Sequence, residues 1–232
     1  YLYDSNNKKY LDCFAGVSVI NCGHCNPVIT DKICEQVKTL QHVCNIYLTE
    51  NFVNLAERLS KIAPGQLQKA FFCSTGTEAN EGAALLATIY TGSSEFICLR
   101  NGLRGRTKLT MSMTGIGMWR TDPNPVGGIS FAPNPYCYRC PLGKTYPECD
   151  LACANAVEDI IKTNTSGKVA AFFAEPIQGN AGIITPPPGY FQRLKEILDK
   201  YNILLVVDEV QTGFGRTGKM FAIENFNIVP DI

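Results

Sequence analysis

Carboxylates follow two apolar runs of this chain, at the points where buried strands would end. Asp208 comes directly after residues 203–207, and Glu175 comes directly after residues 169–174. In open α/β sheets, ligands bind beyond the carboxyl ends of the strands, so both acids are candidates for a binding site. An acid in this position can hold a cationic ring nitrogen in its protonated form, which makes the ring an electron sink. The alternatives are a Mg²⁺-binding or helix-capping role for Asp208, and a turn acid positioned by Pro176 for Glu175.

A third segment combines hydroxyl groups with a glycine between an expected strand at residues 70–73 and an expected helix at residues 78–90. Thr75, Gly76 and Thr77 precede that helix, and the free amides and dipole of a helix N-terminus favour an anion such as a phosphate. The alternative is an ordinary helix cap by one of the two threonines. The segment lacks the lysine of a Walker A loop and the third glycine of a Rossmann fingerprint, so the nucleotide versions of this site are weakly supported.

Short apolar runs alternate with longer helical periods along the rest of the chain. The expected strands are residues 70–73, 95–99, 169–174 and 203–207, and the expected helices are residues 27–40, 51–62, 78–90, 151–163 and 190–201. Residues 111–150 hold many prolines and glycines with little periodicity, so we expect a long irregular stretch there. Strands that alternate with helices predict an α/β fold with a mostly parallel sheet and flanking helices.

The composition excludes several classes of protein. The chain has 232 residues, of which 45% are hydrophobic and 18% charged, so it can bury a core. Its formal net charge is zero, whereas a nucleic-acid-binding protein usually has a basic excess. No apolar stretch approaches the ~20 residues that a membrane-spanning helix needs. Eleven cysteines, an odd number, indicate free thiols in a reducing compartment, and we expect a cytoplasmic protein.

Four of the cysteines are close in the sequence, as Cys137-x-x-Cys140 and Cys149-x-x-x-Cys153. Four thiols at this spacing are able to bind Zn²⁺ or an iron–sulfur cluster. The alternative, a set of reduced cysteines in a cysteine-rich chain, is favoured because seven others lie outside the group. The sequence therefore predicts no metal site. The two histidines are expected to be packed or capping residues rather than catalytic bases.

Taken together and in this order, the segments resemble the class III aminotransferases, which use pyridoxal phosphate (PLP) on fold type I. The segments that carry the resemblance are residues 12–16, 23–27, 74–81, 175–179 and 207–218, the last reading Val-Asp-Glu-Val-Gln-Thr-Gly-Phe-Gly-Arg-Thr-Gly. The resemblance spans the whole chain. It implies the large domain of a fold type I PLP-dependent transferase, with a mostly parallel sheet, flanking helices and part of an N-terminal segment. The most similar members are of the alanine–glyoxylate or 4-aminobutyrate aminotransferase type.

The resemblance also implies roles for individual residues. The residues that it places at the cofactor are Thr75, Gly76, Thr77, Leu103, Arg104, Asp208, Val210 and Gln211. Asp208 would pair with the pyridine nitrogen and Glu175 would lie beside the ring and the substrate, so these two are the expected catalytic residues. Val210 would pack against one face of the ring, and Gln211 would hydrogen-bond the ring hydroxyl.

Three positions depart from the pattern of the family. Leu103 stands where an aromatic residue usually stacks on the pyridine ring, which removes a contribution of ~0.5–1.5 kcal/mol. Arg104 replaces a histidine with a permanent charge, for which a phosphate contact is one expectation. Asn180 stands where members that use glutamate often have a glutamate, and this favours alanine–glyoxylate or ω-amino acid–pyruvate members.

The predicted activity is PLP-dependent transamination of an ω-amino acid or alanine with a 2-oxo acid such as pyruvate or glyoxylate. The alternatives are a non-catalytic relative, a 4-aminobutyrate or acetylornithine–2-oxoglutarate aminotransferase, and an unrelated phosphate-binding module. The expected partners are a small-molecule amino donor, a 2-oxo acid and, by the resemblance, a second copy in a homodimer. No nucleic-acid or membrane partner is expected.

The resemblance implies a domain organisation that extends past residue 232. Residues 1–50 would be an N-terminal segment, and residues 51–232 would be an incomplete PLP-binding large domain. Both ends look cut, since the chain opens without Met and closes before the family's Schiff-base lysine; Lys219 lies in a different motif. We expect the rest of the large domain and the small domain to lie beyond, and the fragment alone to be inactive.

Overall fold

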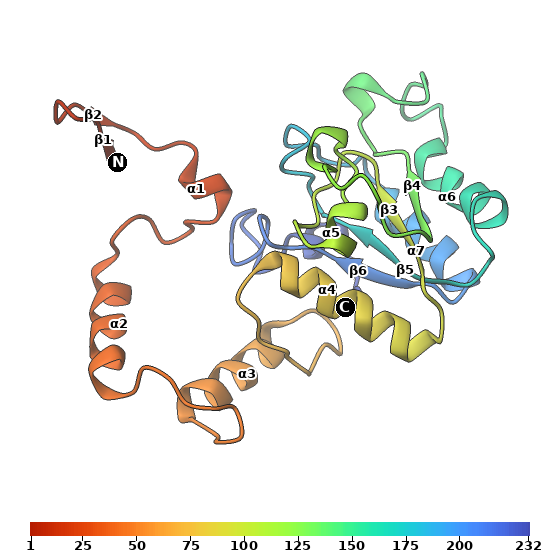
Figure 1. Cartoon of the computed structure of the whole chain (residues 1–232). Helices are drawn as coiled ribbons and strands as arrows, with labels where there is room; N and C mark the ends of the chain where they lie inside the picture. The colour runs from red at the N-terminus through yellow and green to blue at the C-terminus, as the bar shows by residue number, and fades with distance from the viewer.

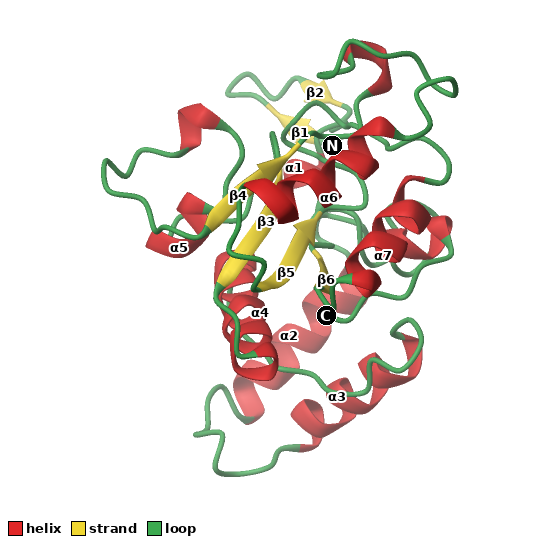
Figure 2. Cartoon of the chain, turned by 90° about the vertical axis from the view of Figure 1, so that its right-hand side faces the viewer, coloured by secondary structure: helices red, strands yellow, loops and turns green.

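The computed structural model describes residues 1–232 and contains a parallel sheet of four strands (Figure 1). In spatial order the strands are β4 (Ile129–Ala132), β3 (Glu95–Leu99), β5 (Val169–Ala174) and β6 (Leu204–Val207), as Figure 2 shows. All three strand pairs are parallel, which confirms the predicted α/β class. The bounds predicted for β3 and β5 are those of the structure, and β6 begins one residue later than expected.

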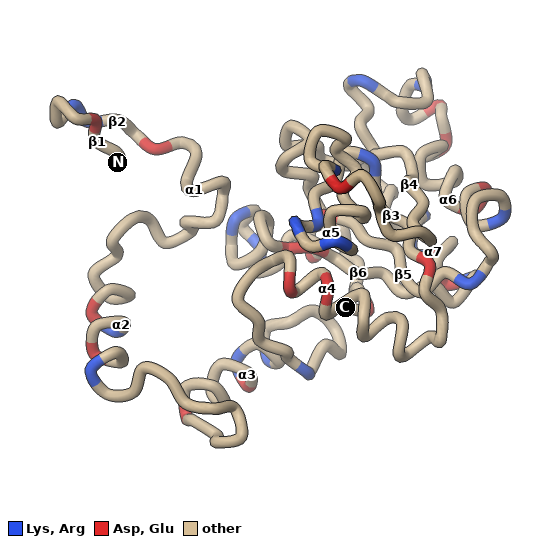
Figure 3. The backbone as a smooth tube through the Cα atoms, viewed as in Figure 1, with Lys and Arg blue, Asp and Glu red and all other residues tan.

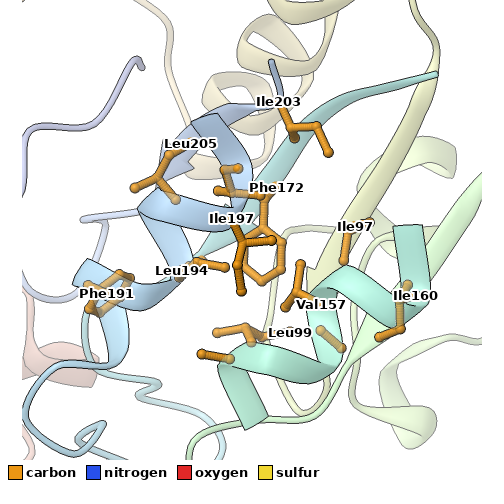
Figure 4. Packing of buried hydrophobic residues seen from close by; sticks show 14 of the residues in the cluster. Ile97, Leu99, Val157, Ile160, Phe172, Phe191, Leu194, Ile197, Ile203 and Leu205 are labelled. Atoms are coloured by element: carbon orange, nitrogen blue, oxygen red, sulfur yellow. The ribbon is translucent and has the colours of Figure 1, made fainter. Parts of the chain in front are cut away.

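Helices cover both faces of the sheet because its strands are apolar on both sides. Helix α4 (Gly76–Thr91) packs on one face, in a cluster of 10 buried residues. Helices α6 (Ala152–Thr163) and α7 (Tyr190–Lys200) pack on the other, in a cluster of 19 (Figure 4). Within β3, Phe96 belongs to the first cluster and Ile97 to the second, as the two-residue period of a strand requires.

The ends of α4 follow from local chemistry. The hydroxyl of Thr75 accepts a hydrogen bond from the backbone N–H of Glu78 at 3.1 Å, and a Glu78 carboxylate oxygen accepts one from the Ser74 N–H at 2.7 Å. This reciprocal cap begins the helix directly after the apolar segment that precedes it. Gly92 ends it in the left-handed conformation, with φ of 69°, which glycine adopts without strain.

The N-terminal region, residues 1–75, contains a hairpin and three helices but no residue that is buried as a whole; the first buried residue of the chain is Asn80. Its elements are β1 (Leu2–Tyr3), β2 (Lys9–Tyr10), α1 (Ala15–Ser18), α2 (Pro27–Thr39) and α3 (Glu50–Ile62). The first four lie apart from the sheet, at the left of Figure 1. Asn21 donates to the carbonyl of Gly213 at 2.9 Å, and Arg216 donates to the carbonyl of Ser18 at 2.9 Å. The predicted division between residues 1–50 and 51–232 stays a prediction.

Two predictions about elements are wrong. Residues 70–73 form no strand, because none of the four strands lies beside them to complete a hydrogen-bonded ladder. The stretch 111–150 is not wholly irregular. It contains the end of α5 (Lys108–Ser112), the 3₁₀ turns η1 (Gly117–Trp119) and η2 (Cys137–Arg139), and strand β4. A third 3₁₀ turn, η3 (Ala222–Phe226), follows β6, and no helix in the chain is long and apolar enough to cross a membrane.

Candidate active site

One pocket lies where the carboxyl ends of β3, β5 and β6 meet the N-terminus of α4. It is lined by Gly76, Thr77, Asn80, Leu103, Arg104, Gly105, Glu175, Ile177, Asn180, Asp208, Val210 and Gln211. The structure therefore brings together the site residues that the sequence predicts, with the exception of Thr75. Thr75 takes the capping role that the sequence left open as an alternative, since its hydroxyl is bonded to the amide of Glu78.

Asp208 is held in place by donors from three sides. Its Oδ1 accepts a hydrogen bond from the backbone N–H of Val210 at 3.1 Å, and its Oδ2 accepts one from the side-chain amide of Asn80 at 3.0 Å. Arg104 Nη1 also contacts Oδ2, at 3.1 Å. Each carboxylate oxygen has two acceptor positions. Both positions of Oδ2 are thus filled, while Oδ1 keeps one for a further donor.

Asn80 was not among the predicted site residues, although the sequence carried a signal for it. Asn80 shares the buried stripe of α4 with Ala83, Ala84 and Ala87, and it is the only polar residue there. Besides Asp208, its side-chain amide donates to the carbonyls of Gly76 at 3.0 Å and Arg104 at 3.1 Å. A buried polar side chain on an apolar helix face needs such partners, so its position was a usable sign of a site.

Arg104 joins the two acids of the pocket. Its side chain is fully buried, and Nη1 lies 2.9 Å from Glu175 Oε1 as well as 3.1 Å from Asp208 Oδ2. Burial lowers the pKa of the guanidinium, but the attraction of both carboxylates outweighs it, so the pKa of Arg104 rises. Burial raises the pKa of the Glu175 carboxyl, against the attraction of Arg104. In this structure the guanidinium therefore faces the two carboxylates, not a helix N-terminus.

The first turn of α4 leaves anion-binding groups free. The N–H groups of Gly76 and Thr77 have no intrahelical acceptor, because the first N–H groups of any helix lack one. Thr77 also brings a hydroxyl into the pocket. A side chain at residue 76 would put its Cβ 2.8 Å from Val210 Cγ2, so glycine allows the side chain of Val210 to approach the first turn of α4 this closely. A Cβ at Gly105 would lie 2.5 Å from the Thr77 hydroxyl.

The remaining predicted cofactor residues also line this pocket. Leu103 lines the pocket, and its backbone N–H donates to Glu175 Oε1 at 3.2 Å. Val210 is exposed, and its side chain lies over the first turn of α4. Gln211 passes so close to Gly179 that a Cβ at residue 179 would overlap its amide oxygen at 1.8 Å. The glycine at residue 179 thus makes room for the side chain at residue 211.

The four neighbouring cysteines line a separate small pocket near the start of α6. They are Cys137, Cys140, Cys149 and Cys153. No group of three or more His, Cys, Asp or Glu side chains stands in metal-binding geometry, and all eleven cysteines are free. Burial raises the pKa of Cys153 to about 11 and that of Cys98, inside the sheet, to about 12. Cys98 is buried within the sheet, whereas Cys34 and Cys73 are exposed.

His24 lies outside the pocket that contains Asp208 and pairs with a carboxylate of the N-terminal region. Its Nε2 is 2.6 Å from Asp12 Oδ2, in the N-terminal region. A hydrogen bond from His24, together with backbone amides, lowers the pKa of the Asp12 carboxyl to about 2. Neither His24 nor His42 lines the pocket of Asp208.

Comparisons with known proteins agree on one family. The sequence model described as aminotransferase class-III matches residues 1–232. The chain is 39% identical over 232 residues to alanine–glyoxylate aminotransferase 2 homolog 2, mitochondrial, of Arabidopsis thaliana, covering 100% of the chain and 48% of that protein. It is 41% identical over 232 residues to acetylornithine aminotransferase of Methanothermobacter thermautotrophicus, covering 100% of the chain and 54% of that protein.

The fold agrees with the same assignment. The crystal structure of the ω-transaminase from Pseudomonas jessenii in complex with PMP has a TM-score of 0.92 and 31% sequence identity, and the match covers 99% of this chain and 53% of that one. The chain thus spans about half the length of the relatives that it matches. Because the family model covers every residue and the fold is the same, this chain belongs to the class III aminotransferase family.

Proposed function

We propose that the protein containing this chain is a PLP-dependent aminotransferase that moves an amino group between an ω-amino acid or alanine and a 2-oxo acid such as pyruvate or glyoxylate. The observation that carries the proposal is the free acceptor position on Asp208 Oδ1, in the same pocket as the unpaired amides of α4. One end of this pocket suits a protonated ring nitrogen, and the other suits a phosphate.

The residues of the pocket fit this cofactor. The amides of Gly76 and Thr77 and the Thr77 hydroxyl would bind the phosphate, and Asp208 would hold the proton on the pyridine nitrogen. Val210 would lie against the ring, and Gln211 would bind its hydroxyl. When bound, PLP supplies a ring that takes up electron density from the reacting carbon of the amino acid. A neutral pyridine would do so less well, and for this reason the charge on Asp208 matters.

The substrate preference is proposed from Asn180, which lines the pocket beside Glu175 and Ile177. Family members that use glutamate as the amino donor often have a glutamate at this position, whereas Asn180 offers only a neutral amide. We therefore propose small or ω-amino donors rather than glutamate. A panel containing alanine, β-alanine, 4-aminobutyrate and glutamate, each with pyruvate, glyoxylate or 2-oxoglutarate, tests this directly. Preferred turnover of the glutamate and 2-oxoglutarate pair would contradict it.

We further propose a homodimer in the cytoplasm. Large apolar side chains of the N-terminal region are exposed, among them Phe71 at 79%, and a second copy, together with the part of the protein beyond this chain, would cover them. Eleven cysteines without a disulfide support a reducing compartment. Basic and acidic residues are interspersed along the chain (Figure 3), and the net charge is zero, so no nucleic-acid partner is proposed.

The sharpest test replaces Asp208 with asparagine in a protein that extends past this chain to the full length of its relatives. The Asp208→Asn variant should still bind PLP through the α4 amides but lose turnover about 100-fold or more, equal to ~2.7 kcal/mol of transition-state stabilisation. Asp159→Asn is the matched control, because Asp159 is an exposed residue of α6. Unchanged turnover of Asp208→Asn with alanine and glyoxylate would overturn the assignment of Asp208.

A further inference from the structure

The buried cluster of Arg104, Glu175 and Asp208 has unequal charges. One guanidinium faces two carboxylates, and the three side chains are 0%, 9% and 7% exposed, respectively. Arg104 is the only cationic residue that lines the pocket. The other groups that face Asp208 are the amide of Asn80 on α4 and the backbone N–H of Val210, both neutral. The cluster thus carries one more negative charge than positive charge when both acids are ionised.

A single nitrogen of Arg104 serves both acids. Nη1 contacts Glu175 Oε1 and Asp208 Oδ2 and also the carbonyl of Leu103 at 2.7 Å, while Nη2 is 3.4 Å from the carbonyl of Phe173. The Nε atom is buried without a partner. Glu175 and Asp208 therefore share one positive charge, and a change at either acid alters how strongly Arg104 neutralises the other.

We propose that Arg104 is a positioning residue that sets the proton affinity of the ring nitrogen bound by Asp208. It occupies Oδ2 together with Asn80, which leaves Oδ1 as the acceptor for the ring N–H. It also neutralises part of the Asp208 charge, so the ring nitrogen holds its proton less tightly than it would beside an unshared carboxylate. This inference rests on the proposed PLP site and adds how that site is tuned.

The proposal predicts opposite effects for two substitutions in one pocket. Arg104→Met removes the positive charge next to Asp208, so the ring nitrogen should become more basic. Glu175→Gln removes the second carboxylate that shares the guanidinium, so Arg104 would neutralise Asp208 more fully and the ring nitrogen should become less basic. A role in packing alone gives no reason for opposite signs.

The experiment uses the full-length protein and 4′-deoxypyridoxine 5′-phosphate labelled with ¹⁵N in the ring. This probe has no aldehyde, so its binding requires no lysine. The ¹⁵N chemical shift against pH reports the protonation of the ring nitrogen. We expect the titration midpoint to rise by about one pH unit or more in Arg104→Met and to fall in Glu175→Gln. Equal midpoints in both variants and in the wild type would overturn the proposal.

The unliganded protein offers a second readout. Without Arg104, both acids are buried with no cation, so their folded-state pKa values rise and stability is lost as pH increases through them. Arg104→Met should therefore lower Tm more at pH 8 than at pH 5, and adding Glu175→Gln should restore much of the loss at pH 8. A loss that is the same at both pH values, without restoration, would contradict the charge role.

Two further variants separate the possible outcomes. Arg106→Met is the matched control, because Arg106 lies over the ring of Trp119, at 4.9 Å, and contacts neither acid. Arg104→Lys keeps the charge if Arg104→Met does not fold, and its ring titration should lie closer to that of the wild type. Failure of the wild type to bind the probe would reject the proposed PLP site. Binding with no effect of Arg104→Met or Glu175→Gln would reject only the role of Arg104.

Discussion

The N-terminal region and the rest of the chain differ in what their helices bury. Helix α7 places Tyr190, Leu194 and Leu198 in the large apolar cluster, where all three are fully buried. Helix α3 has a similar amphipathic pattern, yet Phe52 and Leu55 on it are exposed. The difference shows that an amphipathic sequence determines that a helix has an apolar face, but not which surface of the protein covers it.

The largest expected effect is on the free energy of unfolding, when one aromatic side chain is removed from each region of the 232-residue chain. Phe172→Ala removes a fully buried ring from the central strand β5 and should lower the free energy of unfolding by about 3–5 kcal/mol. Phe71→Ala removes a ring that is 79% exposed and should change it by less than ~0.5 kcal/mol. Urea unfolding followed by circular dichroism measures both. Equal losses would show that residues 1–75 are packed into the core.

A smaller effect is expected from two matched helix caps. Thr75 caps α4, which packs on the sheet, so Thr75→Ala should cost about 1 kcal/mol of global stability. Asn26 caps α2, where its side chain accepts from the N–H of Val28 at 3.1 Å. Because α2 buries no side chain, Asn26→Ala should fray that helix without changing global unfolding. Hydrogen exchange of the α2 amides and urea unfolding separate the two results.

The smallest effect concerns acid pH. Glu158 accepts hydrogen bonds from Lys200 and Tyr201 and pairs with Lys162, and these partners lower its pKa to about 2 from an ordinary 4.5. A lowered pKa stabilises the fold above pH 4.5, and this contribution is lost as pH falls from 4.5 to 2. The Tm of Glu158→Gln should therefore decrease less than that of the wild type as pH is lowered from 4.5 to 2, which thermal unfolding at several pH values measures.

The N-terminal region contains the control for this acid effect. Asp12 also has a pKa lowered to about 2, but its partner His24 lies in the same region, outside the core clusters. Asp12→Asn should change the local order around residues 12–24 and leave the Tm of the core unchanged. A change in the pH dependence of the core Tm as large as that caused by Glu158→Gln would contradict the separation of the two regions.

Much of the fold was predictable because its strands are short continuous apolar runs. Strands β3 and β5 have the predicted bounds, and Asp208 and Glu175 follow strands as expected. Residues 70–73 are also a short apolar run, yet they are not a strand here because no neighbouring strand pairs with them. Strand β4 was missed because its pattern is weak and only its pairing with β3 identifies it. Strand formation depends on a partner that no local pattern specifies.

The sequence by itself determined which residues could do chemistry, since a carboxylate after a buried strand and a threonine-glycine pair before a helix are local features. Only the tertiary structure decided how they combine. In the folded chain the Thr75 hydroxyl caps helix α4, and Asn80 hydrogen-bonds Asp208, which is 128 positions away in the sequence. The guanidinium of Arg104 contacts the carboxylates of Glu175 and Asp208. Charges and hydrogen bonds act over a few ångströms in space, and distance along the chain does not reveal which groups come that close.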